Sequence, residues 1–163
     1  MHFFAWIETT ALSIWLREYP PAFPIILVLH ALGMGFAAGV GVCISLRVQG
    51  VAARVPVSAF RSFLPAMWCG AVASVVSGVA LLLAYPAKAL TNPVFYVKFL
   101  LIGFALRLLY LQAHGPLDPA RQGRVSATDR LQAALAIAAW LGAITSGRLL
   151  AYTHSVLLAS DWL

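Results

Sequence analysis

Charged side chains are scarce in this sequence. Only 10% of the 163 residues are charged and 62% are hydrophobic, and the mean hydropathy is +0.89. A soluble domain is nearer half apolar and about a quarter charged. The composition therefore excludes an ordinary soluble domain and indicates an integral protein of a lipid bilayer. The net charge of +6 does not indicate nucleic-acid binding, because the basic residues are scattered through short segments between apolar runs.

Cysteine and methionine are also rare, with two and three residues. A copper pathway would be expected to use many soft thiol and thioether ligands, so their scarcity counts against such a pathway. Cys43 and Cys69 both lie in apolar runs, and the simplest interpretation is that they are small buried thiols.

Four apolar runs are present, each long enough for the roughly 20 residues that a membrane-spanning helix needs. We expect these spans at about 23–46, 63–85, 95–113 and 131–158. Each must be helical, because an open strand would leave backbone groups unpaired in lipid. The sequence therefore predicts an all-α integral membrane fold, a four-transmembrane-helix bundle that forms a single membrane domain over residues 1–163.

The first twenty residues follow a different pattern. Apolar residues recur at helical spacing on one face, polar residues fall largely on the other, and Pro20 and Pro21 interrupt the chain. This pattern predicts an N-terminal amphipathic helix at about 2–18 that lies in the membrane interface, with Trp6 and Trp15 as anchors. A docking surface for another subunit is the alternative interpretation.

The basic residues predict the orientation. They gather in the first and third loops, as Arg47, Arg54, Arg61, Arg121, Arg124 and Arg130. By the positive-inside rule these loops face the cytoplasm and both termini face the periplasm. We therefore expect a multi-pass protein of the bacterial inner membrane.

Small residues recur every four positions and predict helix contacts. These ridges are Ala31, Gly35 and Gly39 in the first span, Gly70, Ser74 and Gly78 in the second, and Ala139, Ala143 and Gly147 in the fourth. They favour a compact bundle without indicating a function.

Ionisable residues inside the spans are the candidates for function. They are His30, Lys98, Arg107, Arg148 and His154, and none of the predicted spans contains Asp or Glu. Proton-coupled carriers usually depend on membrane carboxylates, so this absence argues against them. A set of cationic or neutral groups calls instead for an anionic or electron-rich partner.

The predicted orientation places His30, Lys98 and His154 near the outer leaflet on three different spans. Small residues flank both histidines, which leaves room for a flat macrocycle between the helices. We therefore predict a heme b site in which His30 is an axial ligand and the other is His154 or Lys98. His30 and His154 are the candidate metal ligands, and Arg148 and Lys98 are the candidate partners of the propionates.

Simpler interpretations remain for each of these residues. His30 could hydrogen-bond a neighbouring helix, and His154 could cap the last turn of its helix. Lys98 and Arg107 could extend to the membrane surface, as long cationic side chains do.

Short motifs resemble a known family. They are the segments at 29–35 (LHALGMG), 45–50 (SLRVQG), 77–78 (SG) and 92–98 (NPVFYVK). Together they resemble an uncharacterised bacterial four-span integral membrane family, itself distantly similar to HemJ-type protoporphyrinogen oxidase and to copper-resistance D-type proteins. The HemJ resemblance implies a heme b site that relies on His30 and Lys98.

Three functions from different classes follow. The first is a heme b-binding, cytochrome b-like subunit that transfers electrons between an external redox partner, a periplasmic or membrane subunit, and the quinone pool. The second is a cofactor-free accessory subunit that stabilises a larger membrane complex. The third is a HemJ-like porphyrinogen oxidase, although no nucleophile or carboxylate base is recognisable in the sequence, which favours a non-catalytic subunit.

Overall fold

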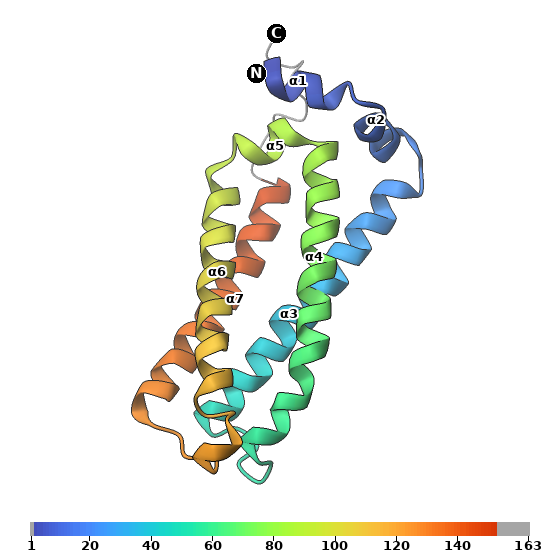
Figure 1. Cartoon of the computed structure of the whole chain (residues 1–163). Coiled ribbons are helices and arrows are strands. Elements are labelled where there is room, and N and C mark those ends of the chain that lie inside the picture. Colours follow the sequence, from blue (N-terminus) through green and yellow to red (C-terminus); the bar gives the residue numbers. More distant parts are fainter. Residues whose placement is uncertain (1, 153–163) are drawn as a thin grey trace.

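The computed structural model of the chain describes residues 2–152, which form helices and turns without any strand. Four long helices make up the bundle (Figure 1). They are α3 (Ala22–Gln49), α4 (Leu64–Ala84), α6 (Pro93–His114) and α7 (Ala127–Tyr152). All four are long and apolar enough to cross a membrane. The predicted all-α membrane bundle is confirmed, and only the far end of the fourth predicted span lies outside the described residues.

Local chemistry sets where these helices begin and end. Asn92 caps α6 by accepting a hydrogen bond from the backbone N–H of Val94 at 3.0 Å. Helix α3 stops at Gly50, which adopts the left-handed conformation with φ of 106°. Helix α7 starts four residues before the predicted span, because Ser126 and Asp129 each accept a hydrogen bond from the other's backbone N–H.

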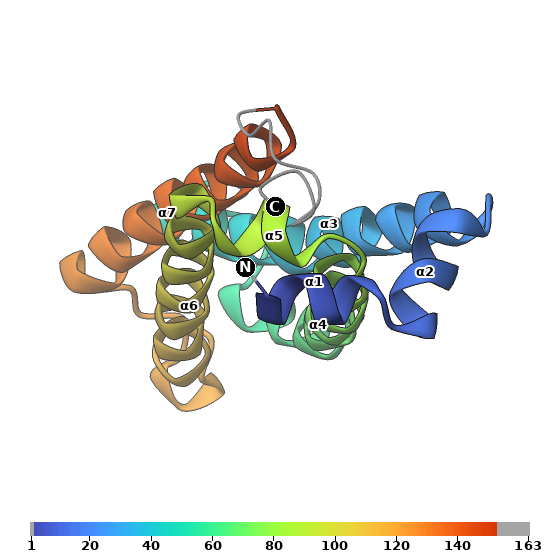
Figure 2. The same ribbon diagram turned by 90° about the horizontal axis from the view of Figure 1, so that it is seen from above.

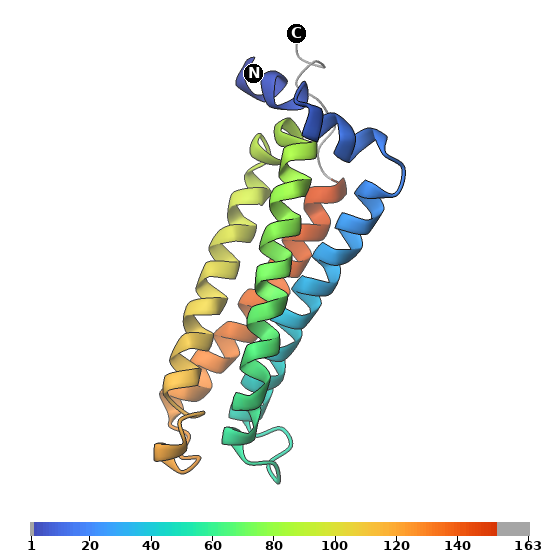
Figure 3. The ribbon, with the colours of Figure 1, turned by 45° about the vertical axis from the view of Figure 1, so that its right-hand side comes forward.

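Short helices lie at both ends of the bundle. At one end, which we call the capped end, lie α1 (His2–Glu8), α2 (Ala11–Glu18) and α5 (Pro86–Leu90). At the other end, which we call the loop end, lie the short 3-10 helices η1 (Val57–Phe63) and η2 (Pro119–Arg121). Figure 3 shows α1 and α2 extending across the capped end, beyond the tips of the long helices.

The N-terminal helix predicted at 2–18 is divided into two helices. Thr10 is extended, with φ of −67° and ψ of 145°, and its hydroxyl accepts a hydrogen bond from the N–H of Ser13 at 3.4 Å. The hydroxyl of Thr9 donates to the carbonyl of Trp6 at 2.8 Å. Threonine hydroxyls that bond nearby backbone groups compete with the helix, and here they end one helix and start the next.

The polar side of α2 faces the bundle. Ser13 donates to the carbonyl of Leu83 at 2.8 Å, and Arg17 donates to the carbonyl of Ala84 at 3.0 Å. The last carbonyls of a helix lack partners within it and favour a cation, so these bonds fix α2 on the end of α4. Trp6 and Trp15 remain 64% and 51% exposed, as interface anchors would be.

The long helices pack in a definite order. Helix α3 packs closely against α4 and α7, and α6 packs closely against α7. Helices α4 and α6 are not a closely packed pair. Viewed from above, α4 is seen close to end-on, whereas α3 and α7 are strongly tilted (Figure 2).

Two glycines bring α3 and α4 together. A Cβ atom added at Gly33 would lie 2.7 Å from the carbonyl oxygen of Gly70 and 2.7 Å from the backbone nitrogen of Ser74. By contrast, nothing lies within 4 Å of a Cβ added at Gly35 or Gly39. The small-residue ridge predicted in the first span was therefore wrong, because the face of α3 that contacts α4 is that of Gly33, two positions away from Gly35. The ridges predicted in the second and fourth spans do face neighbouring helices.

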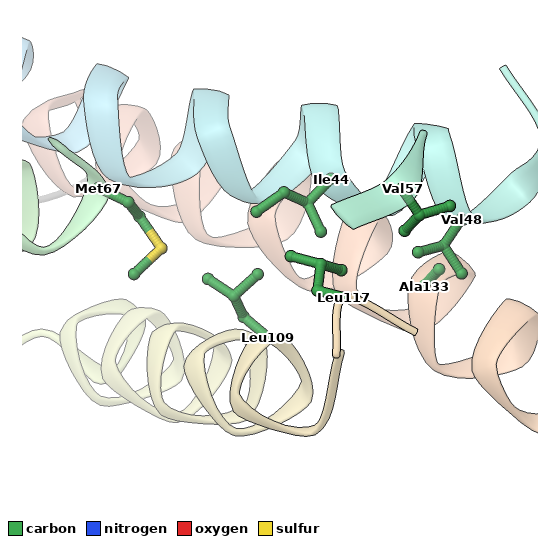
Figure 4. Packing of buried hydrophobic residues seen from close by; sticks show 7 residues of the cluster. All are labelled: Ile44, Val48, Val57, Met67, Leu109, Leu117 and Ala133. Carbon is green, nitrogen blue, oxygen red and sulfur yellow. The ribbon is translucent and has the colours of Figure 1, made fainter. Parts of the chain in front are cut away.

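A hydrophobic cluster closes the loop end. Its buried members come from α3, η1, α4, α6, the α6–α7 loop and α7, and they are Ile44, Val48, Val57, Met67, Leu109, Leu117 and Ala133. Figure 4 shows Met67 of α4 and Leu109 of α6 extending toward each other. This cluster joins all four long helices at one end of the bundle.

We expect Gly33→Ala to destabilise the bundle by about 1–3 kcal/mol, because its methyl group meets backbone atoms of α4 that cannot rotate away. Gly35→Ala is the matched control on the same helix, and we expect it to be neutral or stabilising by up to about 1 kcal/mol. Unfolding of both variants in mixed micelles of rising SDS content measures the difference. Equal stability of the two variants would contradict the packing described.

Candidate functional site

His30 lies on α3, about 12 Å along the helix from its first residue. Its Nδ1 atom is 2.9 Å from the backbone carbonyl oxygen of Ser74 on α4. A carbonyl oxygen only accepts hydrogen bonds, so Nδ1 carries a proton and donates it. In the neutral ring, Nε2 is then the nitrogen with the free lone pair. The Ser77 hydroxyl lies 3.3 Å from Nδ1 and completes the polar surroundings of this edge of the ring.

Lys98 meets His30 from the opposite side. It lies in the second turn of α6, and its Nζ atom is 3.4 Å from Nε2 of His30. The half-buried side chain is directed across the bundle, and a Cβ atom added at Gly147 of α7 would lie 3.6 Å from Nζ. Residues from all four long helices therefore surround the point where the imidazole and the amine meet.

These two side chains line a partly open cavity with two adjoining parts, which we call the His30–Lys98 cavity. The larger part has a volume of about 440 Å³ and the smaller about 150 Å³. Sites for small molecules and cofactors commonly have volumes of about 300–1,000 Å³. Both parts are lined by His30, Lys98, Gly78, Leu82, Phe95 and Phe99.

The cavity exists because α4 and α6 pack loosely against each other and because Gly78 and Gly147 carry no side chains. A Cβ atom added at Gly78 would lie 3.1 Å from Cε1 of His30, so a larger residue there would press on the imidazole ring. The larger part reaches the capped end of the bundle, where Tyr85 and Lys88 line it. Its walls are otherwise mostly aliphatic and aromatic, as in most cofactor sites.

The structure brings together two of the four predicted site residues. His30 and Lys98 are neighbours, whereas Arg148 is exposed on α7 and lines neither part of the cavity. His154 lies outside the described residues, so its role as a ligand stays a prediction. Arg107, considered as a surface cation, is exposed with its guanidinium 5.6 Å from the centre of the Tyr110 ring.

Sequence reasoning predicted Lys98 as a partner of His30 but did not identify the group on α4 that His30 contacts. Ser74 was expected only as a small residue of a helix contact, and its carbonyl oxygen could not be recognised from its side chain. Lys88, which lies in α5 between the second and third spans, also lines the cavity. One feature of the sequence could have indicated the contact of His30 with α4: Ser74 and Ser77 lie one turn apart in an otherwise apolar run. Such a serine pair can satisfy a polar group from a neighbouring helix.

The donor atoms of the cavity suit a ligand with an electron-poor centre or an anionic edge. Across residues 2–152 there is no group of three or more His, Cys, Asp or Glu side chains that could hold a metal ion by themselves. The residues lining the cavity include no carboxylate. A bare metal ion would thus have few ligands here, whereas a metal already held by a macrocycle needs only one or two axial ligands from the protein.

No family model, curated protein or solved structure matches this chain. The function must therefore be inferred from the site itself.

We expect His30 to be protonated on Nδ1 and not on Nε2 in ligand-free protein at pH 8, because the Ser74 carbonyl accepts only from a donor. Nitrogen-15 NMR of histidine-labelled protein in micelles measures the tautomer, and the signal that disappears in His30→Ala assigns it. A signal showing protonated Nε2 and bare Nδ1 would contradict this arrangement.

Proposed function

We propose that the protein is a heme b-binding membrane subunit that transfers electrons between an external redox partner and the quinone pool. The observation that supports this most is the pairing of His30 Nε2 with Lys98 Nζ inside a cavity of suitable size. His30 is already oriented by the Ser74 carbonyl, and metal-binding histidines almost always donate their second ring N–H to such a group.

The residues of the cavity fit heme b in three respects. His30 Nε2 on α3 and Lys98 Nζ on α6 lie 3.4 Å apart, so these two side chains could together hold the iron of a heme. Gly78 and Gly147 carry no side chains where His30 and Lys98 lie against α4 and α7, and both glycines line the cavity. Phe95 and Phe99 supply aromatic walls. Bound heme would supply one-electron chemistry at this point.

The chain itself would contribute binding, orientation and exclusion of water. His30 would hold the heme iron together with Lys98 or His154. If His154 is the second ligand, the Lys98 amine is left to pair with a propionate. The apolar walls from α3, α4 and α6 keep water from the site and thereby tune its potential.

Charge supports a location near the periplasmic surface. Of the basic residues, Arg47, Arg54, Arg61, Arg121, Arg124 and Arg130 belong to the loop end or the adjoining helix turns. The capped end carries Arg17 and Lys88. The positive-inside rule then places the loop end in the cytoplasm and the cavity near the periplasm. An external partner would dock at the capped end, where Trp6 and Trp15 are exposed.

We expect purified wild-type protein to show the reduced-minus-oxidised absorbance of b-type heme. His30→Ala should reduce this absorbance to background, because the ligand oriented by Ser74 is lost. His114→Ala is the matched control, since His114 lies at the loop end of α6, and it should bind as much heme as wild type. Absence of heme absorbance from the wild-type protein, or its persistence in His30→Ala, would disprove the proposal.

The second axial ligand can be identified from the same spectra. If Lys98 is the ligand, Lys98→Met changes the coordination of the heme while His154→Ala leaves it unchanged. The reverse result identifies His154. Arg148→Gln should leave the ligand field unchanged, because Arg148 is exposed and does not line the cavity.

A cofactor-free accessory subunit is the second candidate, and the bond from His30 to Ser74 favours it, because it joins α3 and α4 without any ligand. This function predicts no pigment in wild type and a partner complex that assembles poorly with His30→Ala.

A HemJ-like oxidase would use the same cavity, and rescue of a strain deficient in protoporphyrinogen oxidation would reveal it.

A further inference from the structure

A second hollow lies between α4 and α6, at the opposite end of the bundle from the His30–Lys98 cavity. We call it the loop-end groove. It has a volume of about 240 Å³ and is lined by Arg61, Leu64, Met67, Trp68, Leu109, Tyr110, Ala113 and His114. Its inner wall belongs to the loop-end cluster, where Met67 and Leu109 meet (Figure 4).

The rim of the groove is basic. Arg61, from η1, is exposed, and its guanidinium makes no hydrogen bond or ion pair with another described residue. The rim also holds His114, whose Nδ1 donates to the carbonyl oxygen of Tyr110 at 2.9 Å. Arg107 adds a second guanidinium nearby, 5.6 Å from the centre of the Tyr110 ring.

No described carboxylate opposes these cations in the groove. The acidic residues on this side of the bundle are Asp118 and Asp129, and neither lines it. Asp118 accepts from the N–H of Ala120, and Asp129 forms an ion pair with Arg121 at 3.3 Å. The groove thus combines an apolar floor with an unopposed basic rim.

We propose that the loop-end groove binds an anionic phospholipid, whose phosphate lies against Arg61 and whose acyl chain lies along Leu64, Trp68 and Ala113. Basic pockets between membrane helices on the cytoplasmic side are suited to anionic headgroups. Trp68 and Tyr110 flank the groove and are 51% and 53% exposed, and such side chains favour the level of the headgroups. The lipid fills the interface that α4 and α6 leave open. This site is independent of the proposed heme function.

Native mass spectrometry of the detergent-released protein tests the proposal with phosphatidylglycerol and phosphatidylcholine. We expect wild type to retain phosphatidylglycerol preferentially. Arg61→Gln should weaken its retention about fivefold, the usual contribution of one cation near an anionic surface. Arg54→Gln is the matched control, because Arg54 belongs to the same loop but does not line the groove, and it should retain the lipid as wild type does.

Ala113→Phe tests the apolar part of the groove separately, because the ring fills the hollow without changing the charge. We expect it to reduce phosphatidylglycerol retention while Arg61 stays in place, and circular dichroism confirms that each variant is folded. Glycerol phosphate, which has the headgroup charge but no acyl chain, should not displace the lipid. Displacement by glycerol phosphate, equal effects of Arg61→Gln and Arg54→Gln, or equal retention of the two lipids would each overturn the proposal.

Discussion

The contact between α3 and α4 determines the chemistry of this protein. Gly33 and Gly70 have no side chains, so the two backbones approach until the Cβ of any larger residue would collide with the opposite helix. This approach lets His30 reach the carbonyl oxygen of Ser74. A buried imidazole without a partner is costly in lipid, and the carbonyl both satisfies Nδ1 and directs Nε2 into the cavity. If the helices lay further apart, that orientation would be lost.

Helices α4 and α6, on the other side of the bundle, pack much less closely than α3 and α4. Helices α3 and α7 each pack against two neighbours, whereas α4 and α6 stay apart over much of their length. The interface between them holds the His30–Lys98 cavity at one end and the loop-end groove at the other. Neither hollow has a carboxylate on its lining. Basic side chains without an opposing carboxylate favour ligands that carry an anionic group, which the propionates of heme and the phosphate of a lipid would both supply.

Several features of the fold could be predicted from the sequence because they depend on neighbouring residues alone. An apolar run of sufficient length must become a spanning helix in lipid, and the four spans were found within a few residues of their predicted positions. The break at Thr9 and Thr10 was missed, since the same hydroxyls are tolerated inside other helices. The sequence did not predict that the polar side of α2 faces the bundle, where the carbonyls of Leu83 and Ala84 accept hydrogen bonds from Ser13 and Arg17.

The sequence by itself determined that this is a four-span membrane protein, that His30 needs a partner and that no carboxylate of the spans could provide one. Only the tertiary structure decided that Lys98 and Ser74 are its neighbours and that Gly33, not Gly35, forms the helix contact. The physical reason is that these spans are apolar on every side. Lipid-facing and helix-facing residues then look alike in sequence, and the rotation of each helix is set by packing between segments far apart in the chain.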